Sequence, residues 1–483
     1  MLFNSLHFLI FFPIVSTIYF VLPHRYRWVL LLAASYYFYM VWRPIYALLI
    51  VGSTLVDYYA SIWMEHSDSE RNRRLYLFLS LFTNLGILFV FKYLGFFTEV
   101  INGFTQNDFD VIYLILPMGI SFYTFQTLSY TIDVYRRERE AEKHLGYFAL
   151  YVTFFPQLVA GPIERSSRLI PQLKKKYDFD YQRTVEGLQR MTWGFFKKVV
   201  IADNLAVAVN HVYGNVEEMS GLTLLIATGF FAYQIYCDFS GYSDIAIGSA
   251  RILGIDLLEN FKCPYFSTSI REFWSRWHIS LSTWFRDYVY IPLGGSKKGP
   301  VRTYVNILLV FFISGLWHGA SWMFIIWGGI HGLYSLYERV TENYRIRLWR
   351  GIKLDGTRLQ WFVQWFITMT VVLFSWIFFR ASNLSNALSV VETISDSLVD
   401  LSIFRSIRTN IGQTGIGLFR LVIVFISIII LEYNNLLAEI FNRTYFSVFQ
   451  SKRVPRYLSY YFLVFWILLF GIYGQSEFIY FQF

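Results

Sequence analysis

The chain has 483 residues, of which 55% are hydrophobic, 21% are aromatic and only 16% are charged. Soluble globular proteins carry roughly 25% charged residues, so this composition excludes an ordinary soluble domain and indicates that lipid is the main solvent. The net charge of +9 predicts basic cytoplasmic loops rather than nucleic-acid binding, because no basic stripe is interleaved with polar helices.

Five apolar runs near the N-terminus predict membrane spans. The first run has neither a basic leader nor a small-residue cleavage site, so we expect a retained span and not a signal peptide. Basic residues follow the first, third and fifth runs, which places the N-terminus outside the cytoplasm. The runs are residues 6–22, 28–42, 44–63, 75–97 and 113–134.

The apolar run at residues 144–163 breaks this pattern. Both of its flanks are basic, and Pro156 and the Gly161-Pro162 pair interrupt a regular helix. Irregular backbone at membrane depth survives only inside protein or beside a cavity, so we interpret the run as a re-entrant or broken segment that lines an internal site. An ordinary kinked span is the alternative. Residues 171–190 are polar and basic, which is typical of a helix on the membrane surface.

Further apolar runs extend the pattern to about twelve crossings. They are residues 195–213, 222–247, 304–318, 321–337, 361–379, 416–433 and 457–473, with a polar outer excursion at 381–413. We therefore predict an all-α polytopic membrane protein with about 11–12 transmembrane helices and some re-entrant or short helices. Residues 1–483 are expected to form one membrane domain, with N-terminal spans in 1–134, a catalytic core at about 144–340 and C-terminal spans in 361–483.

His318 ends a short apolar run. At ~1.5 Å per residue, residues 304–318 rise only about 22 Å, whereas the hydrocarbon core is about 30 Å thick. The turn at His318-Gly319 should therefore stop short of the outer surface and bury an imidazole. Ionisable groups at such depth are costly and are candidates for function. The alternative is a neutral histidine hydrogen-bonded to a carbonyl, to Ser314 or to Ser321.

His278 lies in a charged and aromatic run on the cytoplasmic side, which we expect to be one short helix. Trp274 and Trp277 share its neighbourhood, and Glu272 and Arg276 stand at the four-residue spacing of a helical ion pair. An amphipathic helix at the membrane interface, with no chemistry, is the alternative.

Several other polar groups are candidates for either a functional or a structural role. We expect a structural role for His331, and packed thiols for Cys237 and Cys263, which lack metal-ligand spacing. Buried carboxylates need partners, so Asp238 and Asp244 either orient a histidine or form ion pairs with Arg251 and Arg271; we favour ion pairs. The glycine-rich stretch IPLGGSKKGP lacks the phosphate-loop pattern, so we expect a plain turn.

Two motifs carry a resemblance to a known family. They read PYFSTSIREFWSRWHISLSTWFRDYVYIPLGG, from Pro264, and GLWHGASWMFIIWGGIHG, from Gly315. The chain resembles the membrane-bound O-acyltransferases, and within them the branch that serves O-acetylation of bacterial polysaccharides such as alginate. YQIYCDFSGYSDIAIG, FPQLVAGPIER and the terminal IYFQF fit that branch as well.

The resemblance implies roles for the two histidines. His318, in the Trp-His-Gly motif, is then the catalytic histidine, and His278 is the second histidine, with Ser275 before Arg276 as a mild variation. The family's architecture implies a funnel from the outer face that meets an inner tunnel near His318.

We expect the following chemistry from these residues. The donor is acetyl-CoA or another acyl thioester that approaches from the cytoplasmic side near His278, and His318 acts as general base on an acceptor hydroxyl from outside. No bound cofactor is expected and no metal, since no HExxH or CxxC motif occurs. The candidate catalytic residues are His318 and His278, and the candidate substrate-binding residues are Trp274, Trp277, Arg276, Trp317, Asp238 and Tyr242.

The resemblance also implies a partner and a location. The partner is a separate extracytoplasmic acetyltransferase of a polysaccharide-modification complex, which we expect to dock on residues 381–413 of a multi-pass protein in the bacterial cytoplasmic membrane. D-alanyl transfer from a carrier protein to teichoic acid is an alternative within the family. A polysaccharide transporter is the alternative from another class, disfavoured because the chain shows no internal repeat.

Overall fold

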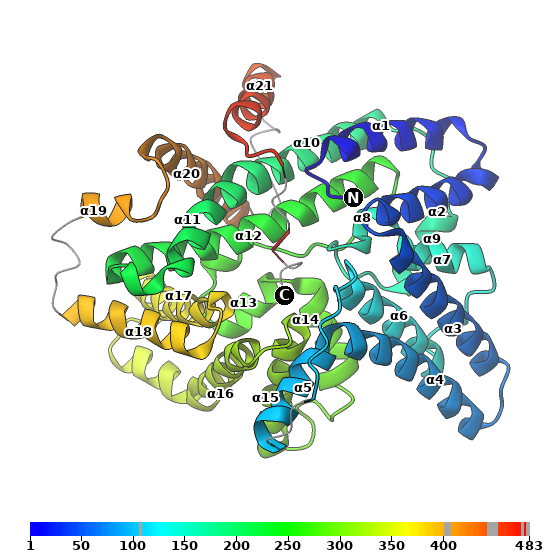
Figure 1. Ribbon diagram of the computed structural model, residues 1–483, viewed down its shortest axis with the longest axis horizontal. Helices are drawn as coiled ribbons and strands as arrows, with labels where there is room; N and C mark the ends of the chain where they lie inside the picture. Colours follow the sequence, from blue (N-terminus) through cyan, green and yellow to red (C-terminus); the bar gives the residue numbers. More distant parts are fainter. Residues whose placement is uncertain (106–108, 400–406, 442–452, 475–477, 480–483) are drawn as a thin grey trace. The chain divides into compact units, whose positions relative to one another are not determined.

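The computed structural model describes residues 1–105, 109–399, 407–441, 453–474 and 478–479 (Figure 1). These ranges contain helices and no strand, so the all-α prediction is confirmed. They form two compact units. The first comprises Met1–Gly194 and Tyr242–Glu259, and the second comprises Phe195–Gly241 and Asn260–Ile479. The expectation of one membrane domain stays a prediction.

The first unit is built around helices α3, α4 and α6 (Figure 1). Its centre is polar, because the Asp57 carboxylate accepts hydrogen bonds from Ser80 Oγ at 2.6 Å and Asn84 Nδ2 at 2.8 Å. The helices are α1 (Leu6–Val21), α2 (His24–Met40), α3 (Ala47–Glu65), α4 (Glu70–Leu88), α5 (Leu94–Thr105), α6 (Ile120–Tyr135), α7 (Leu145–Thr153), α8 (Phe155–Leu158), α9 (Ser166–Lys174) and α10 (Tyr181–Phe195).

The expected break in residues 144–163 is present. Helix α7 ends at Thr153, and the four-residue helix α8 follows it. The chain is irregular from Val159 to Arg165, and all of these residues except the half-buried Arg165 are buried. At ~1.5 Å per residue α7 is about 14 Å long, too short to cross a membrane alone.

The second unit contains most of the candidate site. Helix α12 is shared, since its residues up to Gly241 belong to this unit and the rest to the first. A π-helical segment at Phe196–Ala202 precedes α11. The helices are α11 (Asp203–Gly214), α12 (Gly221–Ile252), α13 (Ile270–Arg276), α14 (Ile279–Phe285), α15 (Pro300–His318), α16 (Trp322–Gly351), α17 (Arg358–Arg380), α18 (Leu384–Val399), α19 (Ile407–Gly412), α20 (Leu418–Ile440) and α21 (Arg453–Phe470).

Fewer helices qualify as membrane spans than the sequence suggests. In the described ranges six are long and apolar enough: Pro44–Glu65, Glu70–Thr105, Gly221–Ile252, Pro300–His318, Arg358–Arg380 and Leu418–Ile440. A multi-pass membrane protein is thus confirmed, whereas the number of crossings stays a prediction. The expected run at 113–134 contributes α6, which has only 16 residues and is almost entirely buried inside the first unit. The sequence of such a helix predicts a span, because burial in protein and burial in lipid both favour apolar residues.

Candidate active site

The hairpin of α15 and α16 fixes the position of His318. At Gly315 an added Cβ would collide with the carbonyl oxygen of Phe324, and at Gly328 with that of Phe311. The two glycines therefore let the helix backbones touch, as small residues do in membrane helix pairs. His318 is the last residue of α15, and Gly319 follows where a side chain would run into the Phe324 ring. The predicted turn directly after His318 is confirmed.

Aromatic rings enclose the His318 imidazole. Its centroid lies 4.9 Å from that of Trp317, 4.8 Å from that of Trp327 and 5.5 Å from that of Phe379. All three contacts are edge to face, with interplanar angles of 80°, 82° and 71°. The residue is only 2% exposed. This packing fixes the ring orientation and keeps bulk water away, which are the conditions that a positioned general base needs.

His278 departs from the expected single helix. It separates α13 from α14 and has φ 43° and ψ 53°, the left-handed conformation that non-glycine residues rarely adopt. Asn260 holds this break: its carbonyl accepts the Ile279 N–H at 3.0 Å, and its Oδ1 accepts the Ser280 hydroxyl at 2.6 Å. The prediction of one continuous helix was wrong, because Asn260 replaces the hydrogen bonds that the helix would have made. Strained backbone of this kind is often found at functional sites.

The two histidines contact the same indole. The Trp317 ring lies 5.9 Å from His278 and 4.9 Å from His318 between centroids. Phe239 also packs against His278, with ring centroids 4.6 Å apart. His278 is fully buried, and this burial lowers its pKa to about 3, so the imidazole is neutral at physiological pH. The structure thus brings the two predicted catalytic residues together around Trp317.

His331 belongs to the same cluster, and its hydrogen bonds define its tautomer. Trp274 Nε1 donates to His331 Nδ1 at 3.3 Å, so Nδ1 carries no proton. The proton is therefore on Nε2, which donates to Ser375 Oγ at 2.9 Å, and Ser375 donates to the Val372 carbonyl at 2.7 Å. His331 is a satisfied buried histidine, as expected, and it also fixes the position of Trp274.

The indoles of α13, α16 and α17 complete the cluster. Trp327 lies between two imidazoles, 4.8 Å from His318 and 5.0 Å from His331. Trp277 stacks on Phe273 at 5.5 Å and meets Trp376 at 5.3 Å. Of the predicted substrate-binding residues, Trp274, Trp277 and Trp317 therefore lie in the cluster; their roles stay predictions.

The other predicted residues have different surroundings. Arg276 forms the expected pair with Glu272 at 2.7 Å and a second pair with Glu439, also at 2.7 Å. Asp238 pairs with Lys198 at 2.7 Å, and its other oxygen accepts the Ile479 N–H at 2.8 Å. The prediction that Asp238 forms an ion pair is confirmed, but the predicted partners Arg251 and Arg271 were wrong, because the partner is Lys198.

Tyr242 and Asp244 lie in the first unit. Tyr242 packs on Phe3, with ring centroids 4.4 Å apart. Asp244 pairs with Arg190 at 2.9 Å, and again neither Arg251 nor Arg271 is the partner. The Arg190 guanidinium also binds Glu259.

The remaining polar motifs form a turn and two free thiols. Gly294 and Gly295 have φ of 105° and 53°, so the glycine-rich stretch is the expected turn, closed by Asn306 Nδ2 on the Gly295 carbonyl at 3.0 Å. Cys237 and Cys263 are free thiols. Within the described ranges no three His, Cys, Asp or Glu side chains are grouped as metal ligands.

Sequence reasoning missed Trp327, Trp376, Phe379 and Asn260. A signal for the first existed, because Trp327 and His331 are four residues apart and therefore share one face of a helix. Trp376 and Phe379 come from a helix far along the chain, and no local pattern indicates that they reach the histidine cluster.

Comparison with known proteins identifies the family. Residues 121–378, which include all three histidines of the cluster, match the membrane-bound O-acyltransferase family. The chain is 39% identical over 435 residues to the probable alginate O-acetylase AlgI of Pseudomonas putida, covering 89% of this chain and 86% of that protein. It is 36% identical over 392 residues to the peptidoglycan O-acetyltransferase of Helicobacter pylori, covering 75% and 72%. A more distant relative is the teichoic acid D-alanyltransferase of Bacillus subtilis, 28% identical over 254 residues and covering 48% and 62%. The chain belongs to the membrane-bound O-acyltransferase family.

Proposed function

We propose that this protein moves an acetyl group from a cytoplasmic thioester, such as acetyl-CoA, across the membrane for O-acetylation of an extracytoplasmic polysaccharide of the alginate type. Family membership makes the chain a membrane O-acyltransferase. The names of its relatives support acetyl as the group and a polysaccharide as the acceptor. The observation that carries the proposal is the buried His318 at the end of α15, one indole away from His278.

The proposed reaction uses His318 as general base. A neutral His318 nitrogen takes the proton of the acceptor hydroxyl while the hydroxyl oxygen attacks the thioester carbonyl carbon. The tetrahedral oxyanion then collapses, the carbon–sulfur bond breaks, and the leaving thiolate receives the proton from His318. No net proton is gained or lost, so the imidazole is ready for another cycle.

His278 and Trp274 are the candidates for holding the acyl group or stabilising the oxyanion. Trp274 was a candidate, but its single N–H is engaged by His331. His278 is neutral and lies one indole away from His318, close enough to the reacting centre to hold the acyl group or stabilise the oxyanion. We therefore assign oxyanion stabilisation to His278 and assign Trp274 to packing against the acyl donor.

The proposed partner surface is α18, which lies in the outer excursion. This helix buries Ala387, Val390 and Ile394, while Leu388 and Leu398 are about half exposed. An exposed apolar stripe beside a packed one is suited to a protein interface. We propose that the extracytoplasmic acetyltransferase docks there.

Reconstitution tests the function. The purified protein in sealed vesicles receives acetyl-CoA on one side and acetyl-acceptor polysaccharide with the partner enzyme on the other, and acetyl transfer is followed with a label on the acetyl group. We expect label on the polymer only when the donor is supplied at the cytoplasmic face. Label from D-alanyl carrier protein instead would identify the teichoic-acid activity. Polymer movement without label would identify a transporter, and either result contradicts the proposal.

A further inference from the structure

We propose that a groove between α12, α17 and α20 binds a phospholipid whose headgroup carries a primary ammonium group, with the ammonium on Glu432 and an acyl chain along α17. The inference concerns lipid binding alone and does not depend on the proposed acyl transfer.

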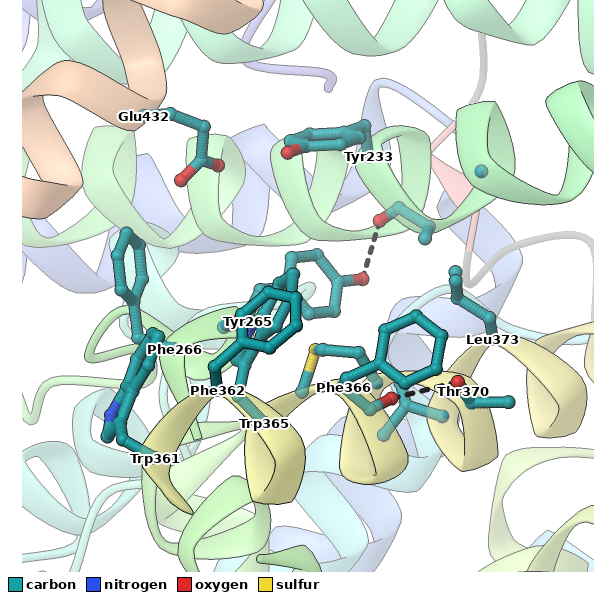
Figure 2. A pocket seen from close by; sticks show the side chains of 14 residues that line it. Tyr233, Tyr265, Phe266, Trp361, Phe362, Trp365, Phe366, Thr370, Leu373 and Glu432 are labelled. Carbon is teal, nitrogen blue, oxygen red and sulfur yellow. Dashed lines mark hydrogen bonds between the residues drawn. The ribbon is translucent and has the colours of Figure 1, made fainter. Parts of the chain in front are cut away.

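The groove is a cavity of about 540 Å³ with an almost entirely apolar, aromatic wall (Figure 2). Trp361, Trp365 and Met369 follow one another at four-residue spacing, so they form one stripe along α17. At ~1.5 Å per residue, the lining from Trp361 to Leu373 extends over about 18 Å, close to one leaflet of a hydrocarbon core about 30 Å thick. The groove therefore has the length of a lipid acyl chain.

The position of the groove makes lipid its natural occupant. Helices α12, α17 and α20, which line it, are all among the candidate membrane spans. Trp361 lies only three residues after the start of α17, next to the basic segment that ends with Arg358. By the charge-based topology this is the cytoplasmic end, so the mouth lies at the inner interface, where tryptophan is enriched.

Glu432 is the polar anchor of the groove. Its carboxyl group faces the aromatic row of α17 across the gap, beside the Tyr233 phenol (Figure 2). Asn435 Nδ2 donates to it at 3.4 Å and the Tyr233 hydroxyl hydrogen-bonds it, but among the described residues no Lys, Arg or His forms an ion pair with it, and Arg276 is held by Glu272 and Glu439. A carboxyl group inside a membrane span is costly and indicates function by default.

The other polar groups of the wall are already used. The Tyr265 hydroxyl donates to the Ala232 carbonyl at 2.7 Å, and Trp365 Nε1 donates to the Tyr265 carbonyl at 2.8 Å. The ligand must therefore combine an apolar body with a cationic group for Glu432. A carboxylate in this place disfavours lipids whose headgroup carries negative charge without a cationic group.

The carboxyl group also distinguishes between cationic headgroups. A primary ammonium donates hydrogen bonds to a carboxylate, and such charge-assisted bonds are the strong ones. A quaternary ammonium has no N–H to donate. We therefore expect phosphatidylethanolamine to bind in preference to phosphatidylcholine and phosphatidylglycerol.

Native mass spectrometry and lipid extraction of the full chain, purified in mild detergent, test the proposal. We expect the wild-type protein to retain phosphatidylethanolamine. The isosteric variant Glu432→Gln should retain about tenfold less, as expected for the loss of one charge-assisted hydrogen bond. Met369→Trp should exclude the lipid by filling the groove. The matched control is Phe374→Trp, on the same helix but outside the groove.

A thermal-shift titration gives an independent measurement. Phosphatidylethanolamine should raise the melting temperature of the wild-type protein and of Phe374→Trp, but not of Met369→Trp. Equal shifts with all three headgroups would overturn the headgroup assignment. Unchanged lipid retention in both Glu432→Gln and Met369→Trp would overturn the site itself.

Discussion

Trp274 and His331 are joined by an indole N–H that donates to the imidazole Nδ1 at 3.3 Å. The bond connects α13 to α16 and holds an indole of the histidine cluster. His331→Ala removes the acceptor of the partly buried Trp274 N–H, and the loss of this hydrogen bond costs about 0.5–1.5 kcal/mol. We expect a lower melting temperature and several-fold lower acetyl transfer with an unchanged pH profile. Ser375→Ala removes only the outer bond and should have a smaller effect. A melting temperature unaffected by His331→Ala would contradict this role.

His318→Ala should reduce acetyl transfer by roughly 10²–10⁴-fold, the usual contribution of a general base. The protein should still be expressed and inserted, because α15 and α16 are held together by backbone contacts at Gly315 and Gly328. His66→Ala is a suitable control, since His66 is exposed and bonds only to its own helix. Near-normal transfer by a well-expressed His318→Ala protein would refute the assignment.

His278 should make the protein sensitive to acid. The imidazole of the unfolded chain takes up a proton below about pH 6.5, whereas burial lowers the pKa of folded His278 to about 3. Its contribution to stability is therefore present above pH 6.5 and is lost as the pH falls below that value, by up to about 1.4 kcal/mol per pH unit. His278→Asn should narrow the difference in melting temperature between pH 7.5 and pH 5.5. An unchanged difference would mean that His278 is not neutral in the fold.

Arg190 should be the most sensitive ionic group of the first unit. Its guanidinium lies 2.9 Å from Asp244 and 2.6 Å from Glu259. Asp244→Asn leaves part of a buried cation uncompensated, and breaking a buried pair costs about 3–5 kcal/mol. We expect a clear loss of purified yield and melting temperature. The double variant Arg190→Met with Asp244→Leu should recover stability in part. Equal damage by the single and double variants would mean that the pair itself is not the cause.

Leu388→Asp tests the partner surface on α18. The side chain is half exposed, so the substitution should leave the fold intact but prevent co-purification of the extracytoplasmic partner. Tyr181→Asp places the same charge on an exposed site of the first unit and should leave the complex unchanged. Undiminished co-purification with Leu388→Asp would place the partner elsewhere.

Much of this fold was accessible from the sequence because lipid imposes long apolar helices and because local spacing sets helix faces. The end of the apolar run at His318-Gly319 predicted where α15 ends, and Pro156 with Gly161-Pro162 predicted the break after α7. The Glu272–Arg276 pair followed from its spacing of four residues.

The rest depends on contacts between distant segments. The left-handed His278 exists because Asn260, eighteen residues earlier, supplies hydrogen bonds that no local pattern reveals. Lys198 reaches Asp238 because a π-helical segment turns it toward α12. Hydropathy also does not distinguish a helix buried in protein from one buried in lipid, so it does not decide whether the buried helix α6 is a span.

The glycine contact between α15 and α16 limits how this centre works. Because a carbonyl oxygen occupies the place of each missing Cβ, sliding one helix past the other by a single residue would drive a side chain into the opposing backbone. The close contact therefore prevents α15 and α16 from sliding along each other, and the imidazole of His318 keeps a fixed position. Under the proposed reaction, donor and acceptor therefore have to come to a stationary ring.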